Sequence, residues 1–336
     1  MSTYGFAPLD ASVRLVQRRL AAALPDARPT GDGTASLELA GQPADSPRCA
    51  PAQLVEGRAL RAHRVDGDPE AAIAAFLDGT QRSRVAAYLH GLPIVLGTVA
   101  AVIRVRHARR LTTWARGPLV GRLLCAPRAL LDDATWHALE GLDLPVRDCS
   151  LDDRGAPVGP HPFALLERAR GIVEYERELA EQELAHRWCG SEQATLLVDG
   201  GISGSERIAS SACTVGVVKS HRTLHVADAD LGIVLGLRHR QRTSVFRVAP
   251  ARRAPVLSWY LRLRDPAGHD PLWGLVRVEA ADPETLGEPA EALTARADRL
   301  SRWILAEAAP VALPDGRWDK MVYGIRDCEE FLRAVC

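Results

Sequence analysis

The chain has 336 residues, of which 47% are hydrophobic and 25% are charged, so its composition is that of a folded protein and excludes an intrinsically disordered chain. Its 42 basic residues balance its 42 acidic residues. Net charge therefore gives no general attraction to nucleic acid, and a site for a polyanion needs local segregation of charge.

Cysteine spacing and the length of apolar runs exclude further classes. The seven cysteines form no CxxC pair, which argues against both a zinc ribbon and a disulfide framework. No run approaches the roughly 18 apolar residues of a membrane span, and the N-terminal residues lack the charged start and apolar core of a signal peptide. We therefore expect a cytoplasmic protein with reduced cysteines.

The first 68 residues predict an N-terminal helical extension. Apolar residues recur at helical spacing over 10–24, "DASVRLVQRRLAAAL", and a second short helix is predicted over 52–64. Between them, the segment from Pro25 to Pro51 is rich in Pro, Gly, Ser and Asp, which predicts a long loop. The main domain is then expected to cover 69–336.

The main domain begins with strands and one long helix. We predict a strand over 73–77, one long strand or a bent pair over 92–106, and another hairpin over 111–126. A turn-rich stretch over 151–162 precedes a helix over 163–188 of about seven turns.

The second half of the main domain alternates strands with turns and closes on a helix. Strands are predicted at 195–198, 211–226, 243–248, 258–264 and 272–280, and an amphipathic helix at 286–307. Strands interleaved with a few long helices indicate a mixed α/β sheet flanked by helices.

Two apolar runs end in Asp-Gly, "IAAFLDGT" at 73–80 and "TLLVDGGISG" at 195–204. Taken singly, an Asp-Gly pair most often marks a turn. Glu176 falls on the apolar stripe of the helix over 163–188, so that three carboxylates, those of Asp78, Glu176 and Asp199, could meet at one edge of the sheet.

Like charges so close coexist in ionised form only around a cation, and an all-oxygen site selects Mg²⁺ or Mn²⁺ over zinc. Such ions activate water for phosphodiester cleavage.

Four segments resemble, in this order, motifs of the NurA nuclease family. They are "FLDGT" at 76–80, "GIVEYERELAEQEL" at 171–184, "LLVDGGISG" at 196–204 and "GVVKSH" at 216–221. The resemblance implies an RNase H-like core with a manganese site formed by Asp78, Glu176 and Asp199. It also implies a homodimer that works with a HerA-type hexameric ATPase in DNA end processing and repair. A shift of the helix ligand to Glu174 or Glu178 stays open.

The family motifs suggest two further site residues. Lys219, in "GVVKSH", would neutralise the scissile phosphate, although a surface lysine on a strand explains it equally simply. Tyr323, in "RWDKMVYGIRDCEEFLRAV", matches the tyrosine of the family's closing motif. The proline that usually follows is Gly324 here, and the usual histidine corresponds to Phe331.

Basic residues are concentrated between 219 and 264, where the sequence has ten Lys and Arg but only two acidic residues, Asp228 and Asp230. Aromatic residues interleave with the arginines, a composition suited to phosphate contacts with some stacking and little sequence specificity. A solvated edge-strand face is the alternative. The candidate DNA-binding residues are Arg222, Arg238, Arg240, Arg242 and Arg247, and the candidate stacking residues are Phe246, Trp259 and Tyr260.

The function predicted from the sequence is that of a divalent-metal-dependent deoxyribonuclease using Mn²⁺ or Mg²⁺. A catalytically degenerate NurA-like subunit that binds DNA or regulates the translocase is the alternative. An actin-like ATP-handling enzyme is disfavoured because the chain has no P-loop and no repeated hairpins after each Asp. A histidine metal site at His221 and His225 is disfavoured because it lacks a third ligand.

Overall fold

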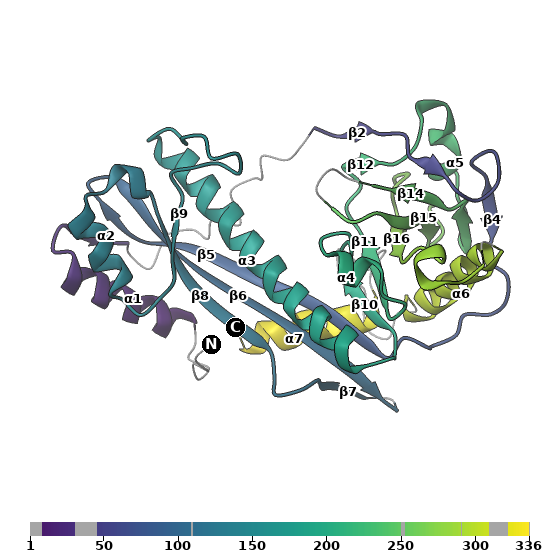
Figure 1. Cartoon of the computed structure of the whole chain (residues 1–336), viewed down its shortest axis with the longest axis horizontal. Coiled ribbons are helices and arrows are strands. Elements are labelled where there is room, and N and C mark those ends of the chain that lie inside the picture. Colours follow the sequence, from purple (N-terminus) through teal and green to yellow (C-terminus); the bar gives the residue numbers. More distant parts are fainter. Residues whose placement is uncertain are drawn as a thin grey trace.

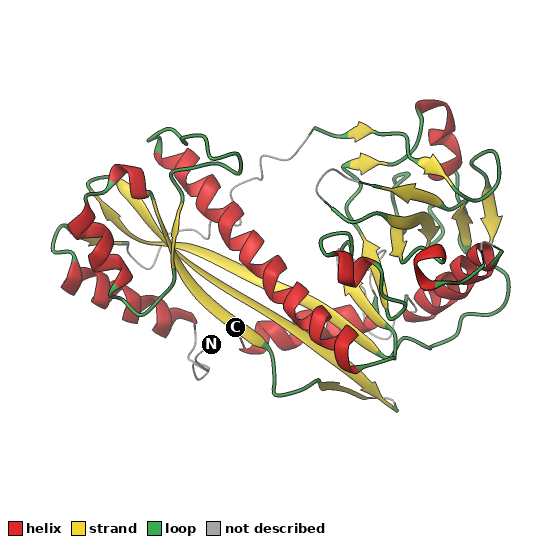
Figure 2. Cartoon of the chain, viewed as in Figure 1, coloured by secondary structure: helices red, strands yellow, loops and turns green. Residues whose placement is uncertain are grey.

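The predicted mixed α/β architecture, a large mixed sheet with helices on both faces, is confirmed (Figure 2). A computed structural model describes residues 9–30, 46–108, 110–249, 253–289, 291–308 and 322–335. Within these ranges fourteen strands form one sheet, whose main path runs β3–β14–β15–β16–β11–β10–β5–β6–β8–β9. Two short strands outside it, β2 (Arg48–Cys49) and β12 (Thr223–Leu224), pair in parallel with each other. None of the described helices has the length and apolar character needed to cross a bilayer.

One half of the sheet is built on two long antiparallel strands, β5 (Ala75–Leu89) and β6 (Leu92–His107). They are joined at His90 and Gly91, whose φ values of 49° and 84° suit a two-residue hairpin turn. Of the two alternatives expected over 92–106, one long strand or a bent pair, the structure shows one long strand. β8 (Leu119–Ala126) pairs with β6, β9 (Val146–Asp148) pairs with β8, and β1 (Ala27–Pro29) pairs with β5. The hairpin predicted over 111–126 is wrong, because β7 (Arg110–Thr113) and β8 each pair with β6.

The other half of the sheet joins the first through β10 (Leu196–Asp199), which is parallel to both β5 and β11 (Thr214–Val218). Antiparallel strands follow: β16 (Leu275–Ala280), β15 (Val256–Arg262), β14 (Phe246–Val248) and β13 (Gln241–Thr243). β3 (Gln53–Leu54) pairs with β14, and β4 (Ala62–Arg64) pairs with β13. The helix predicted over 52–64 is therefore wrong. Gly57, with φ of 75°, takes a left-handed conformation that interrupts a helix.

Two helices sandwich the long strands (Figure 1). α3 (Pro162–Ser191) packs on β5, β6 and β8, and α7 (Tyr323–Val335) packs on β5 and β6. α1 (Leu9–Ala23) and α2 (Asp133–Glu140) lie at the far end of these strands, and α6 (Ala292–Glu307) packs on the second half of the sheet. The helices predicted over 10–24, 163–188 and 286–307 are confirmed, although the last begins at Ala292.

Short helical segments occupy the connections. α4 (Glu206–Ala209) follows β10, and α5 (Leu231–Leu235) follows β12. Single 3-10 turns lie at Arg128–Leu130, Asp228–Asp230 and Glu284–Leu286.

Alternation of side chains along β5 determines which helix each residue meets. Phe76 belongs to the apolar cluster that includes α7, whereas Leu77 belongs to the cluster that includes α3. Asp78 therefore emerges on the face covered by α7, and Gly79 lies under α3. The expected strand over 73–77 with Asp78 at its end is wrong, because β5 continues to Leu89 and places Asp78 inside the strand.

Candidate metal centre

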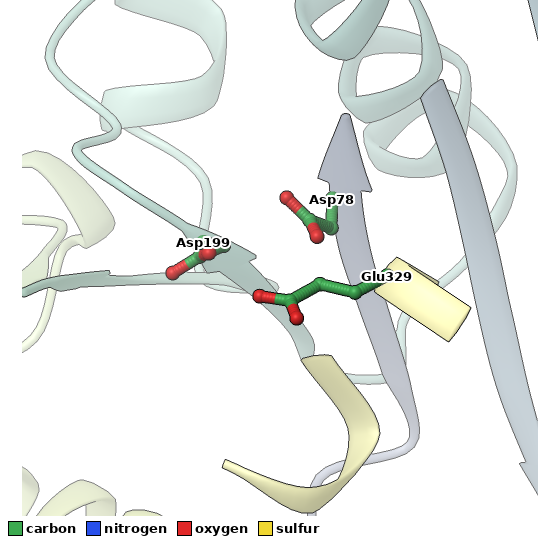
Figure 3. Close-up of side chains that lie close together, drawn as sticks. All are labelled: Asp78, Asp199 and Glu329. Atoms are coloured by element: carbon green, nitrogen blue, oxygen red, sulfur yellow. The ribbon is translucent and has the colours of Figure 1, made fainter. Parts of the chain in front are cut away.

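Three acidic side chains from distant parts of the chain meet beside the junction of β5 and β10. Asp78, Asp199 and Glu329 each offer a carboxylate oxygen, and these oxygens all lie within 4.8 Å of one another (Figure 3). The two aspartates meet because β5 and β10 are parallel and pair Leu77 with Val198, which places the next residue of each strand side by side. Glu329 reaches them from α7.

The carboxylate of Asp78 is nearly excluded from water, with 7% of the residue exposed. Its Oδ1 accepts the backbone N–H of Gly79 at 2.8 Å. Burial, followed by the carboxylates of Asp199 and Glu181, raises the pKa of Asp78 to about 8, although Lys219 acts in the opposite direction. A buried carboxylate with acidic neighbours is stabilised in its ionised form by a bound cation.

Asp199 is half-buried at the end of β10 and forms an ion pair with Lys219, whose Nζ lies 2.8 Å from Oδ1. Lys219 directly follows β11, the parallel neighbour of β10. The sequence motifs suggested Lys219 as a site residue, and in the structure its side chain contacts Asp199.

Glu329 was not predicted from the sequence. The position of α7 depends on contacts with the long strands: Cys328 Sγ donates to the carbonyl oxygen of Phe76 at 3.4 Å, and Asp327 accepts from Arg104 Nε at 2.6 Å. Gly324 lies directly against the ring of Phe76, and a side chain at this position would overlap the ring. These contacts hold the helix close enough to the sheet for Glu329 to reach the aspartates.

The glutamate of α3 that approaches the cluster is Glu181, whereas Glu176 lies elsewhere. Glu176 Oε1 accepts from Arg147 Nε on β9 at 2.6 Å, so this carboxylate is paired at another part of the sheet. The burial argument for Glu176 fails, because its side chain is only partly buried and forms an ion pair with Arg147. Glu181 is 9% exposed and lies over Gly79.

Electrostatics link Glu181 to the two aspartates. Burial is the largest effect and raises the pKa of Glu181 to about 7, with smaller contributions from Glu178 and Asp199. Arg177 opposes this rise by forming an ion pair with Glu181. A signal for Glu181 was present in the sequence, since residues three, four and seven positions later are Leu184, Ala185 and Trp188, all of them buried.

A cleft of about 120 Å³ opens beside Asp199 on the α3 side of the sheet. It is bounded by the glycine-rich loop that follows β10 and by α3. Its charged lining residues are Arg177, Glu178, Glu181, Asp199 and Arg253. Asp199 thus contributes both to the carboxylate cluster and to this cleft.

Two other sequence-based candidates lie around α7. Tyr323 is the first residue of α7 and is 38% exposed. Phe331, at the position of the family's histidine, packs under the guanidinium of Arg104, 4.7 Å from its ring centre. Neither side chain belongs to the carboxylate cluster among the described residues.

The predicted DNA-binding segment contains a structural arginine. Arg242 is fully buried, and its guanidinium pairs with Glu56 at 2.6 Å and with Asp298 at 2.7 Å. Its assignment as a DNA contact is corrected, because both ion pairs consume its donors inside the fold. The three candidate stacking residues are buried as well, with 2% exposure for Phe246 and Trp259 and 0% for Tyr260.

The other arginines predicted to bind DNA differ in their surroundings. Arg247 pairs with Asp282, and Arg240 donates to the carbonyl oxygen of Gly67. Arg222 and Arg238 are exposed. The assignment of these four arginines to DNA binding stays a prediction.

The two histidines considered as metal ligands, His221 and His225, lie outside the carboxylate cluster. His221 Nε2 lies 2.7 Å from the carbonyl oxygen of Leu275. Burial, followed by Arg277, lowers the pKa of His225 to about 4. Neither belongs to an acidic or histidine cluster within the described ranges.

No protein-family model matches the chain, and no curated protein matches its sequence. Among solved structures, the fold is similar to the crystal structure of the NurA nuclease from Sulfolobus solfataricus. The similarity covers 84% of this chain and 81% of that chain, with 10% sequence identity and a TM-score of 0.45.

Proposed function

We propose that the chain is a divalent-metal-dependent deoxyribonuclease whose metal is held by Asp78, Asp199 and Glu329. The observation that carries the proposal is the convergence of three carboxylate oxygens within 4.8 Å of one another. One of them belongs to Asp78, which is nearly fully buried and whose pKa is raised to about 8, so an ion would relieve an electrostatic cost already present. The order of the sequence motifs supports a nuclease.

The donor set fits Mn²⁺ or Mg²⁺. Carboxylate oxygens are the ligands that these hard cations prefer, and the cluster contains neither cysteine nor histidine. Bound there, the ion would lower the pKa of water and stabilise charge on the phosphate oxygens.

The chain's own residues supply the surroundings of that ion. Lys219 holds Asp199 in place and brings a positive charge to the edge of the cluster, where a phosphate would need it. Glu181 adds a fourth carboxylate behind Gly79, and Arg177 offsets its charge. Glu181, in place of Glu176, is thus the glutamate of α3 that acts on the cluster, through its charge and from outside the proposed set of ligands.

Several finer expectations stay predictions. These are the roles of Tyr323, the partnership with a HerA-type ATPase, the homodimer, the part in DNA end processing and repair, and the division of the chain near residue 68. The choice between Mn²⁺ and Mg²⁺ belongs with them.

Manganese binding and DNA cleavage, measured together, test the proposal. We expect free Mn²⁺, followed by electron paramagnetic resonance, to bind wild type. Asp78→Asn, Asp199→Asn and Glu329→Gln should each weaken binding by at least ~10-fold and reduce cleavage of a labelled oligonucleotide by ~100-fold or more. Glu176→Gln is the matched control and should leave both unchanged.

The outcomes separate the alternatives. A wild-type protein that binds DNA but neither Mn²⁺ nor Mg²⁺ would reject the nuclease in favour of a degenerate DNA-binding subunit. Loss of activity in Glu176→Gln with full activity in Glu329→Gln would keep the nuclease and reject this set of ligands.

A further inference from the structure

The segment that forms the long strands is strongly basic. Between Asp78 and Asp132 the sequence contains no acidic residue, yet it contains nine arginines, at positions 82, 84, 104, 106, 109, 110, 116, 122 and 128. This local excess of positive charge lies within β5 to β8 and the connections around them, outside the basic segment over 219–264. It is therefore a second place where a polyanion could bind.

Strand register places two of these arginines on the same face as Asp78. Thr98, in β6, pairs with Arg82 of β5 on one side and with Arg122 of β8 on the other. Directly paired residues share a face, and Arg82 follows Asp78 by an even number of residues along β5. We call Arg82, Thr98 and Arg122 the arginine row.

Packing shows where on that face the arginine row lies. On one side of it, Ala100 of β6 and Val120 of β8 pack in the apolar cluster that includes α7. On the other side, Leu96 and Leu124 pack in the cluster that includes α1. The arginine row therefore crosses the sheet between the areas covered by α7 and α1, whereas α3 covers the opposite face (Figure 1).

Three of the seven arginines outside the row form ion pairs with described carboxylates. Arg104 pairs with Asp327, Arg106 with Glu307 and Arg128 with Asp133.

Arg82 and Arg122 differ, because no carboxylate among the described residues forms an ion pair with either of them. Both are half-buried, and Nε of Arg122 is buried without a hydrogen-bond acceptor. A partly exposed guanidinium group that has no carboxylate partner among the described residues favours an external anion.

We propose that the arginine row binds the phosphate backbone of a nucleic-acid strand and directs it toward Asp78. Four residues along β5 separate Arg82 from Asp78, which is roughly 13 Å, and two strand spacings separate Arg82 from Arg122, which is roughly 10 Å. A backbone with a phosphate every few ångströms contacts both positions. Thr98 lies between the two arginines but is only 5% exposed, so the two guanidinium groups supply the contacts to phosphate.

The choice of nucleic acid rests on charge and on continuity with the carboxylate cluster, and so it depends on the proposed function. Two guanidinium groups that no described carboxylate pairs with match a chain of phosphates better than an acidic peptide, because planar guanidinium groups bind phosphate oxygens in pairs. Contacts to the backbone alone carry no sequence information, and binding at the arginine row should accordingly be insensitive to sequence.

Oligonucleotide binding in the presence of EDTA tests the arginine row apart from the metal. Fluorescence anisotropy of a labelled single-stranded 20-mer would be measured for wild type, Arg82→Gln, Arg122→Gln and the double variant. Each single variant should weaken binding by ~3- to 10-fold, and the slope of log K against log salt should fall by about 0.7 for each phosphate that the variant no longer neutralises. Arg82→Lys, which keeps the charge, should retain most of the slope.

Arg154→Gln is the matched control, since Arg154 is exposed and belongs to neither basic segment. Thermal unfolding would establish that each variant is folded. If the double variant bound the oligonucleotide with wild-type affinity and salt slope, the proposal would be wrong, and an equal loss of affinity in Arg154→Gln would also reject it.

Metal binding distinguishes this proposal from the nuclease proposal. The double variant should bind Mn²⁺ as wild type does, because neither arginine contacts the carboxylates. Oligonucleotide binding that depends on Arg82 and Arg122, in a protein that binds no metal, would reject the nuclease and keep the arginine row.

Discussion

The side chain of Glu181 occupies the space that any side chain at position 79 would need. A Cβ atom at Gly79 would lie 2.9 Å from Cδ of Glu181 and closer still to Oε1. The Asp-Gly pair at 78–79 is therefore no turn: the aspartate faces the carboxylate cluster, and the glycine lets α3 bring its own carboxylate up to the opposite face of the strand.

Gly79→Ala should destabilise the protein by ~1–3 kcal/mol, because Glu181 must move to accommodate the methyl group. Urea unfolding measures the change. In a Glu181→Ala background the same substitution should have a much smaller effect, since the clashing atoms are gone. Gly171→Ala on α3, where a methyl group meets open space, is the control and should be neutral or stabilising by up to about 1 kcal/mol. This account would be wrong if Gly79→Ala lowered the free energy of unfolding by the same amount in the wild-type and the Glu181→Ala backgrounds.

Gly324→Ala should lift the first turn of α7 from the ring of Phe76 and withdraw Glu329 from Asp78 and Asp199. We expect Mn²⁺ affinity to fall by ~10-fold although no ligand is changed, as for other groups that orient metal ligands. Isothermal titration calorimetry measures the affinity. Phe76→Leu makes room for the methyl group, so Gly324→Ala should have a smaller effect in that background. The prediction fails if Gly324→Ala binds Mn²⁺ as tightly as wild type.

Asp78→Asn should stabilise the metal-free protein at high pH. The pKa of Asp78 is raised from its ordinary 3.8 to about 8, so between these values the folded protein holds a proton that the unfolded chain has lost. Stability conferred by the protonated carboxyl group is therefore present below pH ~4 and is lost as pH rises through about 8.

Asparagine has no charge to bury, so its advantage in EDTA should be small at pH 5 and reach ~2 kcal/mol, a few °C in Tm, at pH 9. Thermal unfolding at both pH values measures it. With excess Mn²⁺ at pH 8 the order should reverse, because only the wild-type carboxylate binds the ion. A Tm difference that does not change with pH would refute the electrostatic argument.

Arg242→Gln should act on folding and leave the salt dependence of DNA binding unchanged. Removal of the guanidinium leaves the largely buried carboxylates of Glu56 and Asp298 without their cationic partner, which costs about 3–5 kcal/mol. Urea unfolding should show this loss, whereas Arg238→Gln should stay within ~0.5 kcal/mol of wild type. A stable Arg242→Gln variant with a reduced salt slope would restore Arg242 as a DNA contact.

Local patterns predicted the features that depend on one element. The long helix over 163–188, the strands around Asp78 and Asp199, and the mixed sheet all follow from apolar periodicity, which the structure retains. The burial of Glu181 could also have been predicted, because its helical spacing from Leu184, Ala185 and Trp188 places it on the buried face of α3.

Features that depend on tertiary contacts were not predictable in this way. Glu329 looks like any acid of an amphipathic helix until α7 is placed on β5 and β6. A buried, paired arginine such as Arg242 and an exposed arginine such as Arg238 look identical in sequence, so the basic segment over 219–264 could not be divided correctly. The edge strands β3 and β4 are too short for an alternation of apolar and polar residues to be recognised in the sequence.

The wide separation of the three carboxylates along the chain has a consequence for protein synthesis. Asp78 and Asp199 come into register once β10 pairs with β5, but Glu329 joins them only after α7 has emerged from the ribosome and docked on Phe76. Until then the nascent chain lacks one of its three proposed ligands. On the proposed function, a partly synthesised chain has an incomplete metal site and does not cleave DNA. Hydrolytic activity begins only when the C-terminal helix α7 has folded onto the sheet.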